Sequence, residues 1–440
     1  MTPIEIGILG IVALIILLLI RVPVGISLLI VAALGNSLLT APGPALELLG
    51  GDVVAITQRN ALAAIPLFIL TGVIMSKTNV FAALFELMKT LFGRGKGGLA
   101  VATIGAGAVS SAVYASERDV ISAMQTSAIS QMRENNYNSG LISGITAVGS
   151  SLALLIPPSL ALIVFGVMAE ASIPQLLLAG ILPGGILTVL LMLAVPIALK
   201  LKAGLVPDSK ASVASAISSL KAAWVAPVIF LKVFVLIYFG WGTPTEAAAT
   251  SAGLALLYAL ITKQMSMKIL TDSLVEAMKA SAKVLLLVIG GSVFGLFFIR
   301  SLVPMALIEF FSQAGISLMV LKVLALLIIL ACSLFFDKLA TLTVVVPIVF
   351  PILQGFRANG VLFGILAIFA LMIGTMLKSH KLLSAAEPEP TSKKQPKTQI
   401  AAKDTLAAIW PFIILVILLF AVVALFPITA LFLPSMMFGL

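Results

Sequence analysis

Two consecutive prolines stand inside a long apolar stretch, and they constrain the fold of this chain more than any other feature. The stretch runs from Leu141 to Val167 and contains Ile156-Pro157-Pro158-Ser159. Each proline removes a backbone donor and pushes the residue before it out of helical geometry. In hydrocarbon the freed carbonyls need internal partners, so the break must face protein or a water-lined cavity. Broken membrane helices of this kind are typical of secondary transporters, where they face ions and anions.

The composition is that of a membrane protein with many crossings. Of the 440 residues, 61% are hydrophobic and only 10% are charged, and the mean hydropathy is +1.22. A soluble domain is about half apolar and a quarter charged. Apolar runs recur along nearly the whole length. They predict about ten to twelve crossings and leave no room for a sizeable soluble domain.

The sequence contains few residues of the kinds that enzymes use for catalysis or metal binding. It has one cysteine, Cys332, and one histidine, His380, which excludes an intrachain disulfide and argues against a metal centre. It has no nucleophile elbow, phosphate-binding glycine loop or metal-ligand spacing. The net charge of +10 is better explained by cytoplasmic loops facing anionic membrane lipid than by nucleic acid. We therefore predict no enzymatic activity, no cofactor and no nucleic-acid partner.

Basic residues predict the orientation in the membrane. They concentrate at 200–223, at 263–268 and at 377–404, and we assign these three loops to the cytoplasm. The residues before Ile6 and after Phe426 contain no Lys or Arg, so both termini are predicted outside, with an even number of crossings. The first apolar run follows an acidic residue and is expected to be a retained helix, not a signal peptide.

The basic loop at 200–223 also divides the chain into comparable halves, as in transporters built from inverted repeats. The predicted segments are N-terminal scaffold helices at 1–60, a first transport repeat at 61–199, the basic loop at 200–223, second-half scaffold helices at 224–290, a second transport repeat at 291–376, a polar basic loop at 377–404 and a C-terminal membrane helix at 405–440.

Two features of the first half are candidate site elements. The run from Gly97 to Val113 is rich in small residues and ends at Tyr114-Ala115-Ser116. It predicts either a re-entrant hairpin whose tip faces Pro157, or a tightly packed helix followed by a solvated loop, since Glu117-Arg118-Asp119 come next. The polar residues before the prolines are expected to line a site, although such hydroxyls often bond to their own backbone; they are Thr146, Gly149, Ser150 and Ser151.

The second half has two more candidates. Thr243-Pro244-Thr245-Glu246 has the pattern of a capping box at a helix start, which is compatible with a substrate contact if that start points at the site. Asp337 lies near an apolar segment that we expect Pro347 and Pro351 to break, and an ionisable residue at membrane depth suggests function. The alternative is an interfacial aspartate paired with Lys338. Basic residues inside other apolar runs are given no role; they are Lys232, Lys283 and Arg300.

Six segments together resemble the large membrane subunit of TRAP (tripartite ATP-independent periplasmic) transporters, in the family's order and near its spacing. They are Ala64–Leu70, Gly149–Ser159 and Leu178–Gly184 in the first half, and Gly242–Ala249, Phe336–Ala340 and Pro427–Pro434 in the second.

The resemblance implies an all-α polytopic membrane protein of the elevator type, with two inverted repeats, re-entrant hairpins and broken helices. It implies sodium-coupled import of an organic acid, such as a dicarboxylate or sialic acid, across a bacterial inner membrane. The partners would be a periplasmic substrate-binding protein and a small membrane subunit on a separate chain. Family members have outward-facing termini, in agreement with the charge pattern.

The resemblance also implies sites. A first sodium site would use backbone around Ser116 and from Gly149 to Pro157, and a second would use the hairpin tip near Asp337 and a second broken helix. The wider set of expected substrate and ion contacts adds Ser150, Ser151, Pro158, Ser159, Thr243, Thr245 and Glu246.

Three departures from the family pattern stand out. The first tip is charged, and Lys338 replaces the usual glycine. The second break should follow Asp337 by the 41 residues that separate Pro157 from Ser116, yet Lys378 stands there and no proline is near. These departures leave open a divergent membrane paralogue of the same fold that is regulatory or does not transport.

Overall fold

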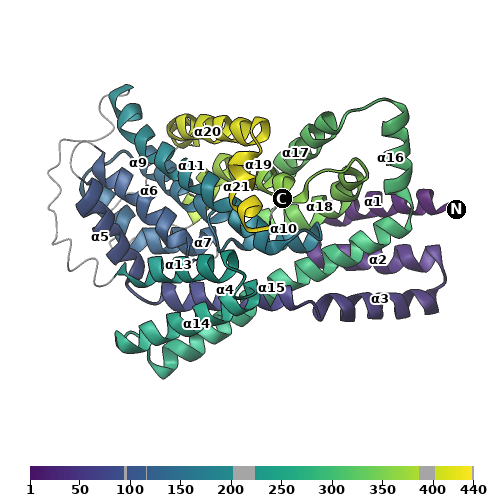
Figure 1. Cartoon of the computed structure of the whole chain (residues 1–440), viewed down its shortest axis with the longest axis horizontal. Helices are drawn as coiled ribbons and strands as arrows, with labels where there is room; N and C mark the ends of the chain where they lie inside the picture. The colour runs from purple at the N-terminus through teal and green to yellow at the C-terminus, as the bar shows by residue number, and fades with distance from the viewer. Residues whose placement is uncertain (94–96, 115, 202–222, 386–401, 439–440) are drawn as a thin grey trace.

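The computed structural model describes residues 1–93, 97–114, 116–201, 223–385 and 402–438, and within them the chain is helical, without strands (Figure 1). The first-half helices are α1 (Pro3–Leu19), α2 (Val24–Leu39), α3 (Pro42–Thr57), α4 (Asn60–Ser76), α5 (Val80–Phe92), α6 (Gly98–Ser111), α7 (Glu117–Met124), the π-turn η1 (Gln125–Ile129), α8 (Ser130–Glu134), α9 (Ser139–Ser151), the 3₁₀ turn η2 (Leu152–Leu154), α10 (Leu160–Met168) and α11 (Ile173–Leu201). The second-half helices are α13 (Val225–Tyr238), α14 (Pro244–Ile261), α15 (Met267–Arg300), α16 (Val303–Gln313), α17 (Leu318–Phe335), α18 (Lys338–Gly355), α19 (Gly360–Ala385), α20 (Ala402–Leu425) and α21 (Ile428–Phe438).

The helices are long and apolar enough for a membrane, as the composition predicts. In the described ranges, five could each cross a bilayer by length and composition, and two bent pairs, α3 with α4 and α20 with α21, raise this to seven. Shorter apolar helices such as α1, α2 and α13 would have to supply the rest of the predicted ten to twelve crossings. The predicted loop at 200–223 lies almost wholly outside the described residues, and α19 continues to Ala385, so the polar loop predicted at 377–404 begins as helix.

One long helix, α15, contacts helices of both halves and crosses the predicted boundary at 290/291 between scaffold and transport segments. It has 34 residues and runs diagonally along the lower part of Figure 1, packed against α2, α4 and α18. Its first half carries five charged residues, whereas residues 284–299 are uncharged. Arg300 at its end donates two hydrogen bonds to Asp52 of α3, at 2.6 and 2.9 Å. This bidentate pair attaches α3 to the end of α15.

The first half forms the hairpin that the small residues predicted. Helix α6 packs against α7 and α8, and the chain reverses between Ser111 and Glu117. The alternative of a solvated loop is wrong, because the side chain of Glu117 is only 3% exposed. Ala115 at the turn lies outside the described residues.

The proline pair breaks the next helix, as predicted. Helix α9 ends in one 3₁₀ turn, and α10 begins only at Leu160, after the cis Pro157–Pro158 bond. Helix α11 lies close to this break because Gly180 has no side chain: a Cβ there would collide with the carbonyl oxygen of Leu155. Gly180 and Gly184 therefore let α11 pack directly against the break.

The second half forms a hairpin without a matching break. Helices α17 and α18 pack together and the chain reverses at Phe336-Asp337. The expectation that Pro347 and Pro351 break α18 is wrong, because the helix continues through both. Helix α19 is also continuous through Lys378, as the lack of a proline there predicted.

Candidate functional site: two hairpin tips at a broken helix

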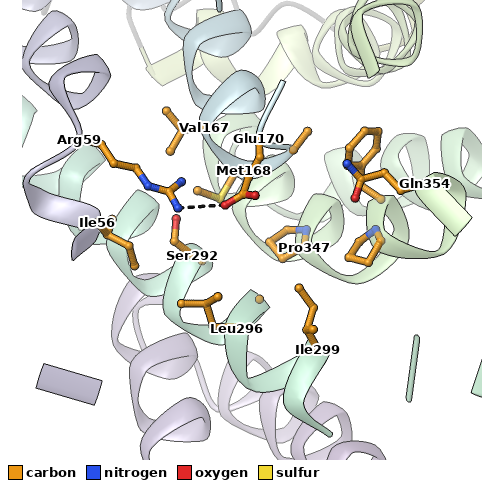
Figure 2. Close-up of a pocket in the computed structure, with 15 residues that line it drawn as sticks. Ile56, Arg59, Val167, Met168, Glu170, Ser292, Leu296, Ile299, Pro347 and Gln354 are labelled. Carbon is orange, nitrogen blue, oxygen red and sulfur yellow. Dashed lines mark hydrogen bonds and ion pairs between the residues drawn. The ribbon is translucent and has the colours of Figure 1, made fainter. Parts of the chain in front are cut away.

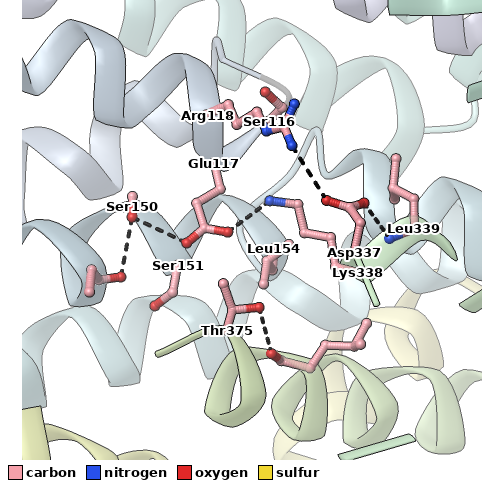
Figure 3. Close-up of polar contacts among 12 residues, drawn as sticks. Ser116, Glu117, Arg118, Ser150, Ser151, Leu154, Asp337, Lys338, Leu339 and Thr375 are labelled. Atoms are coloured by element: carbon pink, nitrogen blue, oxygen red, sulfur yellow. Dashed lines mark hydrogen bonds and ion pairs between the residues drawn. The ribbon is translucent and has the colours of Figure 1, made fainter. Parts of the chain in front are cut away.

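The tips of the two hairpins meet through a buried ion pair. Lys338 Nζ, at the start of α18, donates to Glu117 Oε2, at the start of α7, at 2.7 Å. Their side chains are only 13% and 3% exposed. Ser150 Oγ of α9 donates to the other carboxylate oxygen of Glu117 at 3.4 Å. Figure 3 shows this contact, whose charged partners are separated by 221 residues of sequence.

A second pair lies beside the first. Arg118 Nη2 is 4.0 Å from Asp337 Oδ2, and both side chains are largely exposed, at 78% and 50%. Each tip therefore presents an acidic and a basic residue in succession, and each residue faces its opposite on the other tip. We call Glu117, Arg118, Ser150, Asp337 and Lys338 the tip cluster (Figure 3).

Burial makes these two pairs energetically unequal. Removing one partner of a buried ion pair costs about 3–5 kcal/mol, because the other charge remains desolvated. An exposed pair contributes about 0–1 kcal/mol. The Glu117–Lys338 pair therefore dominates the contact between the hairpins.

Asp337 and Ser116 both act as helix caps. Asp337 Oδ1 accepts from the backbone N–H of Leu339 at 3.1 Å, which caps α18. The alternative that pairs Asp337 with Lys338 is wrong, because Lys338 bonds to Glu117 instead. Ser116 Oγ donates to Asp119 Oδ2 at 2.7 Å and accepts from the N–H of Asp119, which caps α7. Both predicted residues therefore lie at the tips and cap helices there, and Asp337 also faces Arg118 of the other tip.

Most hydroxyl groups of the broken helix form hydrogen bonds within that helix. Ser159 Oγ donates to the Leu154 carbonyl at 2.6 Å and caps α10 by accepting from Leu162 N. Ser151 Oγ bonds back to Val148, as isolated membrane hydroxyls often do. Ser150 Oγ also bonds back, to the Ala147 carbonyl at 3.2 Å, but it additionally reaches Glu117 of α7. The other predicted residues here have structural roles: Gly149 leaves room for the side chain of Met124, and Pro157 and Pro158 make the break.

The predicted residues of α14 lie elsewhere. Thr243 and Glu246 form the predicted capping box, in which Glu246 N bonds to Thr243 Oγ1 at 3.2 Å and Thr243 N to Glu246 Oε2 at 2.7 Å. Thr245 Oγ1 donates to the Asn60 carbonyl at the start of α4. The Thr245 bond joins α14 to α4, and none of the three residues contributes to the tip cluster.

A small cavity lies at the opposite end of α10. Its volume is about 80 Å³, and it lies between the end of that short helix, α15 and α18. The pair of Arg59 and Glu170, 2.9 Å apart and exposed, lies at its edge (Figure 2). Ser292 Oγ lines it, buried and without a hydrogen-bond partner. Helix α10 therefore connects the break at its N-terminus with a cavity about 14 Å away at its C-terminus.

Three functional candidates escaped the sequence analysis: Glu117, Lys338 and Lys378. Sequence reasoning treated them as departures from a pattern, because nothing in a linear sequence pairs residues from different halves. One sequence feature is consistent with the Glu117–Lys338 pairing: on both tips an acidic residue is followed directly by a basic one. In the part of the chain that the structure describes, no cluster of three or more His, Cys, Asp or Glu side chains is placed to hold a metal ion.

Comparison with known proteins agrees with this architecture. The family profile described as "Tripartite ATP-independent periplasmic transporter, DctM component" matches residues 11–429. The sialic acid TRAP transporter large permease protein SiaM of Vibrio cholerae is 32% identical over 358 residues, which cover 80% of this chain and 82% of that protein. The sialic acid TRAP transporter permease protein SiaT of Haemophilus influenzae is 30% identical over 72% of this chain, which spans only 51% of its length.

A solved structure shares the fold. The YdaH transporter of Alcanivorax borkumensis, described as having an unusual topology, superimposes with a TM-score of 0.61 over 85% of this chain and 86% of that one. Its sequence identity is 14%, so this likeness concerns the fold alone.

The family profile and the Vibrio relative both cover most of the chain. Proteins of this family are integral to the bacterial inner membrane, are transport proteins and not enzymes, and work with a small membrane subunit and a periplasmic binding protein. The chain belongs to the family of TRAP transporter large permease subunits.

Proposed function

We propose that this chain is the large permease subunit of a secondary active transporter that imports an organic acid together with sodium ions. The acid would be a dicarboxylate, sialic acid or a similar carboxylate, delivered by a periplasmic binding protein. The small membrane subunit would be a separate chain. The transport domain would move as an elevator relative to the scaffold.

The observation that carries this proposal is the broken helix beside the tip cluster. The break places the N-terminus of α10 inside the protein, which favours an anion, and ends α9 and η2 in carbonyls, which favour a cation. Ser150 places a hydroxyl before the break and Ser159 places one directly after it. A single interruption therefore offers groups for both a carboxylate and a coupling ion.

The charge balance of the tip cluster supports coupling to a cation. Its two acidic and two basic side chains pair with one another, so their formal charges cancel. A carboxylate that enters a water-poor site needs compensating charge. Since Lys338 is already neutralised by Glu117, accompanying sodium ions would supply that compensation.

The test is uptake into proteoliposomes that contain this chain and its small subunit. Radiolabelled sialic acid and succinate are the probes, each with the binding protein and an inward sodium gradient. We expect accumulation of one of them that disappears when the binding protein is omitted or when choline replaces sodium. Ser159→Ala should slow uptake several-fold because it removes the cap of α10, whereas Ser435→Ala, whose hydroxyl bonds only within α21, should not. Sodium-independent uptake of either acid would refute the coupling.

One observation favours a second candidate, a paralogue of the same fold that does not transport. The continuous α19 and the paired tips depart from the expected symmetry of two breaks. For this candidate, neither probe would accumulate although the chain assembles with its small subunit. Saturable, sodium-driven flux would exclude it.

A further inference from the structure

The turn of the second hairpin is a place where several negative features converge. Helix α17 ends there, and the last carbonyls of a helix carry the negative end of its dipole. The carbonyl of Phe336 follows directly, and the carboxylate of Asp337 is the next side chain. The Asp337 carboxylate already caps α18 and faces Arg118, so the carbonyl oxygens at the end of α17 are what attract a further cation here.

A lysine from another helix brings its ammonium group to this turn. Lys378 Nζ of α19 donates to the Phe336 carbonyl oxygen at 2.7 Å. The side chain is half-buried, and its backbone lies in a continuous helix. The Lys378 side chain therefore places a positive charge at the negative end of the α17 dipole.

The position of the first half that corresponds to Lys378 by spacing is uncharged. There Pro157 stands 41 residues after Ser116, as Lys378 stands 41 residues after Asp337. At the first break the Leu154 carbonyl accepts from the hydroxyl of Ser159, not from an ammonium group. The break at Pro157 also frees carbonyls, whereas the continuous α19 keeps its carbonyls within the helix.

We infer that Lys378 is a tethered cation that occupies the place of a mobile coupling ion in the second half of this protein. One sodium ion fewer would then bind to each chain than in a transporter with two broken helices. This inference deepens the proposed sodium coupling and rests on it for its role in transport, but it concerns ion binding, which is measurable without substrate or flux.

The experiment counts sodium ions bound to the purified full-length chain in nanodiscs, with ²²Na⁺ as the probe. Lys378→Met removes the charge and keeps much of the side-chain volume, so we expect it to bind one sodium ion more than the wild type. Lys378→Arg retains a charge and should leave the count unchanged. Lys322→Met, the same substitution near the other end of α17, is the matched control and should also leave it unchanged.

The outcomes separate this inference from the proposed function. The wild-type count tests the proposed first site, whereas the increment caused by Lys378→Met tests the tethered cation. If the wild type binds no sodium ion and Lys378→Met binds one, the tethered cation is supported and sodium coupling is contradicted. A folded Lys378→Met protein with no increment would overturn the inference. Two sodium ions on the wild type would also overturn it, and that measurement needs no variant.

Discussion

Removing the charge of Glu117 tests how firmly the two hairpins are joined. At 2.7 Å, two unit charges in surroundings with an effective dielectric constant of about 20 attract by roughly 6 kcal/mol. Desolvation of both groups offsets much of this attraction, but removing one partner leaves the cost of the other. We therefore expect Glu117→Gln to reduce the free energy of unfolding by about 3–5 kcal/mol, since it leaves the ammonium of Lys338 buried and unpaired.

The assay is denaturation of the purified chain by a graded addition of sodium dodecyl sulfate, followed by the fluorescence of its three tryptophans. Arg118→Gln is the matched control. It removes a charge from the adjacent residue of the same tip, but from an exposed pair, and should cost no more than about 1 kcal/mol.

A double-mutant cycle isolates the pair itself. Lys338→Met alone should destabilise about as much as Glu117→Gln, whereas the double variant leaves no unpaired charge and should lose about 2–3 kcal/mol less than the sum. Strictly additive losses, or equal losses for Glu117→Gln and Arg118→Gln, would refute the argument that burial makes this pair the main link between the hairpins.

Three further predictions concern the surroundings of the site. Gly180→Ala should lower the melting temperature and cost about 1–3 kcal/mol, because its Cβ meets the carbonyl of the broken helix, whereas Gly185→Ala, with no atom within 4 Å of its Cβ, should be tolerated. Arg300→Gln should cost about 1–3 kcal/mol in the same denaturation assay, since it unpairs the mostly buried Asp52; a change below the error of the assay would contradict this. Thr243→Ala should cost about 1 kcal/mol and speed hydrogen exchange in the first turn of α14 alone, so faster exchange at the hairpin tips would show a wider role.

Much of the fold was predictable because membrane helices obey local rules. Pro157 and Pro158 predicted the break, the small residues of α6 predicted the first hairpin, and Thr243 with Glu246 predicted a helix start. In each case the deciding physics lies within a few residues of sequence. The expected break at Pro347 and Pro351 was wrong, because a proline inside a helix removes one hydrogen bond without necessarily ending the helix.

The candidate site was less predictable because its partners come from different halves. Asp337 was correctly placed at a hairpin tip, but its neighbour Lys338 pairs with Glu117, 221 residues away. Conversely, Thr245 carries a polar group that looked suitable for substrate, yet it ties α14 to α4. Pairing of this kind depends on how the two hairpins are packed, which residue spacing does not show, and the acidic-then-basic order on both tips is the one sequence feature consistent with it.

The charge distribution along α15 has a consequence for where the membrane surface lies. The helix is about 51 Å long, well beyond the roughly 30 Å of a hydrocarbon core. Its uncharged part, residues 284–299, covers only about 24 Å, so the boundary between water and lipid falls near Lys283. The exposed ion pair of Lys77 and Glu276, 2.8 Å apart, lies about two helical turns beyond Lys283 and joins the end of α4 to the charged part of α15. The charge pattern of α15 thus indicates the depth in the membrane of the helices that pack against it.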